Sequence, residues 1–157
     1  MLLDSIKKDL KIAMKSKDTL KISTLRMITS SIKNMEISNR GSSNEDSSEN
    51  SLSDNAIIQL LSKMIKQRRE SAEIYSKSNR NDLEKKENDE IVIIEKYMPT
   101  QIDDKEVNEL IDQAINDTSS LNIKDMGKVM SVLKEKYSGQ MDFGKASSIV
   151  REKLNSQ

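Results

Sequence analysis

The chain contains 157 residues, with 26 basic and 26 acidic side chains and a hydrophobic fraction of 34%. This length suits one or two small domains with a thin apolar core. Cys and His are absent from the sequence, which excludes disulfides, thiol nucleophiles, Cys-ligated zinc and imidazole base chemistry. No apolar run reaches the ~20 residues of a membrane helix, and the first residues lack a signal-peptide core, so we expect a cytoplasmic protein with no membrane partner.

Apolar residues recur at helical spacing, and the sequence holds one proline and four glycines, so we predict an all-α chain. Before Pro99 the periodic runs predict four helices, at about 2–16, 19–37, 54–76 and 81–97. The stretch 39–52 is polar and aperiodic, and we expect it to be a mobile loop. Pro99 disfavours helical geometry at Met98 and marks the end of an N-terminal helical domain, residues 1–98.

Three apolar runs follow Pro99, and each is preceded by a residue suited to cap a helix. The capping residues are Asp103, Asn122 and Asp142. They predict helices at about 104–117, 123–137 and 143–154. We therefore expect a C-terminal three-helix domain, residues 99–157. The predicted architecture is a four-helix N-terminal unit followed by this small three-helix unit.

Charged residues interrupt the apolar lines of the third and fourth predicted helices. Arg68 and Glu87 each lie four residues from two apolar residues of their own helix. In an antiparallel hairpin Arg68 would fall opposite Asp89, with Glu87 and Glu90 within about one turn. A charge on a buried line is costly unless it is paired. Arg68, Glu87 and Glu90 are thus predicted to form a structural ion cluster, and the alternative is an acid/base pair in a cleft.

Charge is unevenly distributed along the chain. Residues 1–40 carry nine basic and four acidic side chains, whereas residues 81–120 carry four basic and twelve acidic ones. Such runs are usually solvated helix faces. The alternative is a phosphate-binding surface. Its candidate residues are Arg26, Lys33, Lys66, Arg69 and Arg80. Tyr75 is the one aromatic residue nearby, so we expect recognition of structured RNA by shape and backbone rather than by base stacking.

A glycine stands near the start of the sixth predicted helix, within the segment Met126–Met130. Glycine in a helix is about 1 kcal/mol less favourable than alanine. One explanation for Gly127 is close packing of a neighbouring helix against the bare backbone. The other is close approach of an RNA backbone, with Lys128 contacting a phosphate.

Short segments in a fixed order make the chain resemble the YqeY-like proteins of the GatB/YqeY family, from about Leu3 to Leu154. The segments are Leu25-Arg26-Met27, Ser31-Ile32-Lys33, Lys66–Ser71, Arg80, Asp82-Leu83, Glu87, Glu90, Tyr97-Met98-Pro99, Asp125–Met130, Gly139 and Asp142. Two features depart from the family pattern. Met98 stands where the family usually has Leu, and residues 38–52 form a longer polar insert.

The resemblance implies the same two-part, all-helical build. In the longer GatB subunit of the tRNA-dependent amidotransferase, the similar domain is the tail that contacts tRNA, which implies that Gly127 and Lys128 face RNA here. The family grouping also implies carbon–nitrogen ligase activity with glutamine as amido-N-donor, and amidotransferase subunits as partners. The sequence itself contains no Gly-rich phosphate loop, no metal-ligand cluster and no Ser or Cys nucleophile motif.

We therefore expect an accessory protein with no catalytic site, metal or cofactor of its own, which binds tRNA or another structured RNA in aminoacyl-tRNA amidation or translation. One alternative is an adaptor that binds another protein and no nucleic acid. The other is a component of a glutamine-dependent ligase that acts only with partner subunits.

Overall fold

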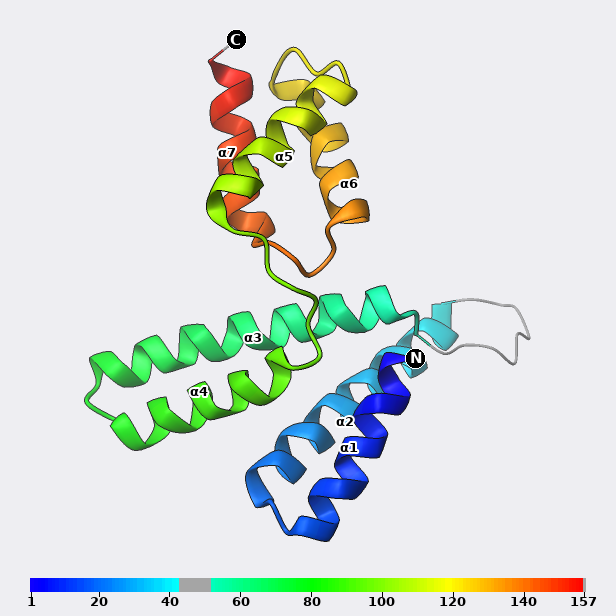
Figure 1. Cartoon of the computed structure of the whole chain (residues 1–157), viewed down its shortest axis with the longest axis vertical. Helices are drawn as coiled ribbons and strands as arrows, with labels where there is room; N and C mark the ends of the chain where they lie inside the picture. Colours follow the sequence, from blue (N-terminus) through cyan, green and yellow to red (C-terminus); the bar gives the residue numbers. More distant parts are fainter. Residues whose placement is uncertain (43–51, 157) are drawn as a thin grey trace. The chain divides into compact units, whose positions relative to one another are not determined.

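The computed structural model describes residues 1–42 and 52–156, and their regular structure is helical (Figure 1). No strand occurs within these two ranges, which confirms the predicted all-α class. The chain forms two compact units, Met1–Met98 and Pro99–Gln157. Each unit has its own apolar core. None of the described helices is both long and apolar enough to cross a membrane.

The helices of the N-terminal unit are α1 (Leu2–Ser16), α2 (Thr19–Ser42), α3 (Asp54–Lys77) and α4 (Asn81–Glu95). They form two antiparallel hairpins, α1 with α2 and α3 with α4 (Figure 1). All four helices contribute to one core because each has an apolar line at helical spacing. Its most deeply buried members are Ile6, Leu25, Ile28, Ile32, Ile57, Leu61 and Ile94.

Local backbone preferences fix the two hairpin turns and the start of α3. Lys17 ends α1 in the left-handed conformation, with φ 56°. The Asp18 carboxylate then accepts a hydrogen bond from the Lys21 amide at 3.0 Å and caps α2. Asn79 takes φ 54° between α3 and α4, a conformation that Asn tolerates better than most residues. The Ser53 side chain accepts a hydrogen bond from the Ala56 amide and caps α3.

The second helix is longer than its sequence predicts. It continues to Ser42, so residues 39–42 are helical and the mobile-loop prediction is wrong for them. This stretch contains no proline, and the weak helix preference of its Ser and Asn residues does not stop a helix that is already formed. Leu52, at the other end of the predicted loop, is buried in the core. The rest of that prediction, residues 43–51, lies outside the described residues.

The fourth helix ends at Glu95, before the predicted position 97, and a turn leads to Pro99. In this turn the Tyr97 hydroxyl donates a hydrogen bond to the Asp9 carboxylate on α1, at 2.6 Å. Burial of the phenol, with a further contribution from the Asp9 carboxylate, raises the pKa of Tyr97. The bond ties the end of the α3–α4 hairpin to α1.

The C-terminal unit contains α5 (Asp104–Asp117), the 3-10 turn η1 (Ile123–Asp125), α6 (Met126–Lys136) and α7 (Phe143–Asn155). The predicted caps are present. Asp103, Asn122 and Asp142 each accept a hydrogen bond from a nearby backbone amide, at 2.8, 3.0 and 2.8 Å. The sixth predicted helix therefore opens with a 3-10 turn before the α-helix begins. The core of the unit includes Ile111, Val129, Leu133, Ala146 and Val150.

Candidate functional site

Arg68 of α3 and Glu90 of α4 form an ion pair inside the N-terminal unit, with side chains 9% and 8% exposed. The Arg68 Nε donates to a Glu90 oxygen at 2.8 Å, and its Nη1 donates to the Met64 carbonyl at 3.3 Å. The Nη2 lies 2.8 Å from the sulfur of Met27 on α2. One guanidinium therefore links α2, α3 and α4.

The structure does not bring Glu87 into this pair. Glu87 is half-buried, and its side chain makes no ion pair or hydrogen bond with a described residue. Asp89, predicted to face Arg68, pairs instead with Lys85 along α4. A single carboxylate held by a buried guanidinium lacks the second titratable group that paired acid/base catalysis needs. Arg68 and Glu90 form a buried, directly hydrogen-bonded ion pair that joins the two helices of the hairpin.

The predicted basic residues of the N-terminal unit are all exposed, but their partners differ. Arg26 and Lys33 on α2, and Lys66 on α3, make no ion pair with a described residue. Arg69 and Arg80 pair with carboxylates of α4, at 2.9 and 3.4 Å. Exposed ion pairs contribute little to stability and are screened by salt. All five side chains are therefore accessible to a ligand, and three of them have no carboxylate partner among the described residues.

Four further lysines on α1 are not among the predicted site residues: Lys7, Lys8, Lys11 and Lys15. All four are exposed, and none makes an ion pair or a side-chain hydrogen bond with a described residue. The charge count of residues 1–40 indicates this region without identifying the positions. The signal that identifies them is helical spacing, because positions 7, 11 and 15 recur every four residues.

Gly127 and Lys128 lie in the first turn of α6, and both are exposed. A Cβ built on Gly127 would meet no atom of the described residues within 4 Å, apart from its chain neighbours and the backbone of its own helix. Close packing of a neighbouring helix therefore does not explain this glycine. The Lys128 side chain is 69% exposed, and its Nζ lies 3.4 Å from the Asp125 carboxylate.

Asp125 also organises the turn ahead of α6. Its carboxylate accepts a hydrogen bond from the Leu121 amide at 3.1 Å. This bond, together with the ion pair to Lys128, lowers the pKa of Asp125 and favours its charged form. The same turn leaves two apolar side chains in solvent, since Leu121 is 73% exposed and Ile123 is 42% exposed. We call Leu121–Lys128 the α6 entry segment.

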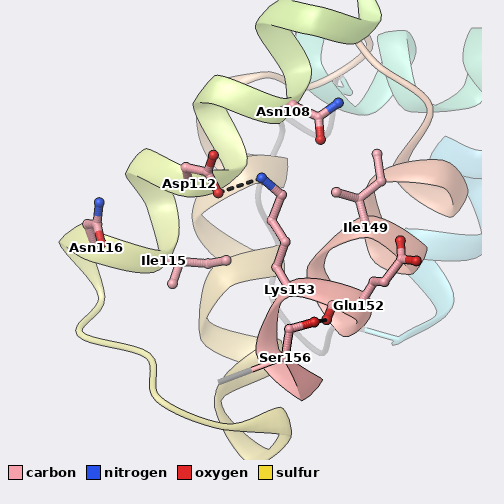
Figure 2. Close-up of a pocket in the computed structure, with 8 residues that line it drawn as sticks. All are labelled: Asn108, Asp112, Ile115, Asn116, Ile149, Glu152, Lys153 and Ser156. Carbon is pink, nitrogen blue, oxygen red and sulfur yellow. Dashed lines mark hydrogen bonds and ion pairs between the residues drawn. The ribbon is translucent and has the colours of Figure 1, made fainter.

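A shallow groove of about 550 Å³ lies between α5 and α7 (Figure 2). Two isoleucines and several polar side chains line it: Asn108, Asp112, Ile115, Asn116, Ile149, Glu152, Lys153 and Ser156. Lys153 of α7 reaches across to Asp112 of α5 and forms an ion pair at 2.5 Å (Figure 2). The central charges of the groove thus neutralise each other. Within residues 1–42 and 52–156, no group of acidic side chains is placed to hold a metal ion.

Known proteins match most of the length of this chain. The family model described as Yqey-like protein matches residues 3–154. The protein named "Altered inheritance of mitochondria protein 41, mitochondrial" from Lachancea thermotolerans is 40% identical over 131 residues, which cover 79% of this chain and 65% of that protein. Its namesake from Vanderwaltozyma polyspora is 36% identical over 107 residues, covering 64% and 54%. That from Clavispora lusitaniae is 32% identical over 118 residues, covering 74% and 64%.

These relatives are mitochondrial proteins by name, and the chain spans between about half and two thirds of their length. The family match is broader, because residues 3–154 include both compact units and run from α1 into α7. It also contains the Arg68–Glu90 pair and the α6 entry segment. The chain therefore belongs to the YqeY-like protein family.

Proposed function

We propose that the chain is a non-catalytic accessory protein that binds tRNA or another structured RNA through phosphate contacts and shape. The observation that carries this proposal is the α6 entry segment, where Gly127 is exposed and a Cβ would meet no neighbouring described residue beyond its own helical turn within 4 Å. Glycine in a helix is about 1 kcal/mol less favourable than alanine. Within the described residues, no neighbouring group packs into the space left by the absent side chain. A nucleic-acid backbone could approach closely in this space.

Lys128 supplies the charge for such a contact. Its exposed pair with Asp125 is weak in water, so a phosphate can share or replace that carboxylate. The hydrogen bond from the Leu121 amide to Asp125 keeps the turn in place while this happens. The resemblance to the tRNA-contacting tail of GatB supports the same assignment for Gly127 and Lys128.

Cations of the N-terminal unit are proposed to make further phosphate contacts of their own. Arg26, Lys33 and Lys66 are exposed without a carboxylate partner among the described residues, and Arg69 and Arg80 hold only exposed partners. Each cation that meets a phosphate releases counterions, which makes binding strong at low salt and weak at high salt. Aromatic residues make up 3% of the sequence, so shape and phosphate contact supply the recognition.

The proposed setting of this binding is aminoacyl-tRNA amidation or translation in the cytoplasm, with amidotransferase subunits as candidate partners. The grouping with GatB supports this setting. We assign no catalytic step to the chain alone, and any carbon–nitrogen ligase activity would come from the partner subunits. Because the matched relatives are named as mitochondrial proteins, imaging of the tagged full chain in its own cells tests the proposed compartment.

Titration of the full chain with bulk tRNA at two salt concentrations tests the function directly. Each phosphate contact adds about 0.9 to the slope of log affinity against log salt, so six contacting cations predict a loss of about 1,000-fold between 50 and 200 mM salt. Absence of tRNA binding at 50 mM salt would contradict the proposal.

Two substitutions test the α6 entry segment. Gly127→Ala should raise the stability of the C-terminal unit by up to about 1 kcal/mol and yet weaken tRNA binding, because the added methyl group blocks close approach. Lys128→Glu should weaken binding through charge reversal. The matched control is Lys134→Glu, the same change at another exposed lysine of α6 that has no ion pair with a described residue. Equal losses for Lys128→Glu and Lys134→Glu would mean that net charge, not this segment, governs binding.

A protein–protein adaptor is the second candidate, favoured by the exposure of Leu121 and Ile123 at 73% and 42%. Exposed apolar side chains at a turn are suited to a pocket on another protein. The adaptor function predicts that Leu121→Ser with Ile123→Ser abolishes capture of purified amidotransferase subunits. It also predicts that the wild-type chain shows no salt-dependent affinity for tRNA.

A further inference from the structure

The solvent-facing side of α1 carries a row of cations that no other part of the described chain neutralises. We propose that Lys7, Lys8, Lys11 and Lys15 form a phosphate-binding surface that holds the backbone of a structured RNA. This inference rests on the proposed function, and it names a contact surface outside the residues assigned to that function above. We call these four residues the α1 lysine row.

The packing of α1 determines where the row lies. Ile6 and Ala13 are buried in the core of the N-terminal unit, and Leu10 packs partly buried against it. At 3.6 residues per turn, positions 7, 8, 11 and 15 then fall on the side of the helix that faces away from this core. All four lysines are exposed, in agreement with that placement. The row extends for about 12 Å, at a rise of about 1.5 Å per residue.

The acidic residues near the row contact groups other than its lysines. Residues 1–21 contain six lysines and three aspartates. Asp4 lies 3.8 Å from the N-terminal amine, Asp9 accepts the Tyr97 hydroxyl, and Asp18 caps α2. None of them forms an ion pair with a lysine of the row. Positive charges spaced four residues apart on one helix repel one another, so the row destabilises α1 unless an anion binds to it.

Three observations favour an RNA backbone over a membrane surface. The apolar side of α1 is already used by the core, and the exposed Ile12 and Met14 lie on opposite flanks of the row, so no continuous apolar face remains to insert into lipid. The row is also about as long as the ~10 Å Debye length at 0.1 M salt, so its charges act together on a polyanion. Arg26 and Lys33 add exposed cations on α2, the other helix of the same hairpin.

The experiment is a titration of the full chain with bulk tRNA at salt concentrations from 50 to 200 mM. Replacing all four lysines of the row with Gln should lower the slope of log affinity against log salt by about 3 to 4, since each lost phosphate contact removes about 0.9. Between 50 and 200 mM salt, the fold-loss of affinity should then be about 100 times smaller for the variant than for the wild-type chain. The melting temperature should stay equal or rise, because like-charge repulsion is removed.

Two matched variants isolate the row. The first variant has the same change of net charge in the C-terminal unit. It replaces with Gln four exposed lysines that have no ion pair with a described residue: Lys105, Lys134, Lys136 and Lys145. This control should keep a slope within about 1 of the wild-type value. Replacing the α1 lysine row with Arg should preserve the slope, because the charges remain.

Two outcomes would overturn the inference, and they differ from a failure of the proposed function. In the first outcome the wild-type chain binds tRNA with a salt-dependent affinity, and the fourfold Gln variant has the same slope. RNA binding would then stand, but α1 would not be part of the RNA-binding surface. Loss of binding to phosphatidylglycerol vesicles in that variant, with tRNA binding unchanged, would make the row a membrane contact. A wild-type chain that does not bind tRNA at 50 mM salt would instead contradict the proposed function itself.

Discussion

The two hairpins of the N-terminal unit both carry many cations, but they neutralise them differently. In the α3–α4 hairpin Arg68 is buried against Glu90, and Arg69 pairs with a carboxylate of α4 at 2.9 Å. In the α1–α2 hairpin the lysines of α1 and the exposed Arg26 and Lys33 make no ion pair with a described residue. The number of cations in a hairpin therefore does not indicate whether carboxylates of the folded chain pair with them.

Position relative to the core explains the difference. Arg68 stands on the apolar line of α3, so its charge leaves water on folding and must be paired. The lysines of α1 stand on the opposite side from the core, where water solvates them and folding requires no partner. A cation that the fold neutralises belongs to the scaffold, whereas one that the fold leaves open is available to an anionic ligand.

The largest expected effect is the loss of the buried pair. Glu90→Ala leaves the Arg68 guanidinium buried without its carboxylate, and we expect the free energy of unfolding to fall by about 3–5 kcal/mol. Urea unfolding followed by circular dichroism measures this change. The double variant Arg68→Met with Glu90→Leu should recover most of the stability, because it removes both buried charges. A loss below 1 kcal/mol for Glu90→Ala would mean that water, rather than Glu90, satisfies the guanidinium.

The second largest expected effect is the loss of the hydrogen bond between Tyr97 and Asp9, which joins the two hairpins. Tyr97→Phe removes the hydrogen bond to Asp9, and a bond to a charged group contributes about 1.5–3 kcal/mol. We expect a stability loss in this range at pH 7, measured by urea unfolding. Asp9→Asn keeps an acceptor and is the milder control. Equal stability of Tyr97→Phe and the wild-type chain would show that this bond adds nothing beyond packing.

The same bond makes the contribution of Tyr97 depend on pH. Its folded-state pKa is raised, so the folded chain holds the phenolic proton more tightly than the unfolded chain does. The stabilisation is therefore fully present below the ordinary Tyr pKa of about 10 and decreases as the pH rises above that value. The stability difference between the wild-type chain and Tyr97→Phe should shrink between pH 9.5 and 11. A difference that is constant over this range would contradict a role for the phenolic proton.

A charge reversal within the α1 lysine row should raise the stability of the chain, whereas the preceding substitutions lower it. Lys11→Glu places a carboxylate four residues from both Lys7 and Lys15, and each such pair contributes about 0.2–0.5 kcal/mol. We expect a gain of about 0.4–1 kcal/mol in stability at low salt, together with weaker tRNA binding. Thermal unfolding at 20 and 500 mM salt measures the gain, which should disappear at the higher concentration. A destabilised Lys11→Glu would mean that Lys11 has a partner in the folded chain.

The helices and most of their ends could be predicted because their causes are local. The capping residues Asp103, Asn122 and Asp142 act on amides two or three residues away, and all three predictions are confirmed. The end of α2 at Ser42 was not predictable in the same way, because no single residue between 37 and 42 forbids a helix. Where termination depends on weak preferences, spacing alone does not locate it.

The pairing of charges was only partly predictable, because it depends on contacts between helices. The apolar line identified Arg68 as a buried cation, but the register is shifted by one residue, so Glu90 rather than Asp89 faces it. Glu87 lies three residues before Glu90 and makes no ion pair with a described residue. The open space around Gly127 has no sequence signal at all, because it depends on what the fold leaves empty.

The smallest expected effects give the sharpest contrast between the hairpins. Lys85 of α4 pairs with Asp89 four residues on, whereas Lys11 of α1 has only like charges at that spacing. Lys85→Gln should therefore lower stability by about 0.3–0.5 kcal/mol, and Lys11→Gln should raise it by a similar amount. The two variants have the same net charge and the same new side chain, so a general charge effect would move both in one direction. Opposite shifts in melting temperature at low salt, both lost at high salt, would show that the fold neutralises one lysine and leaves the other to a ligand.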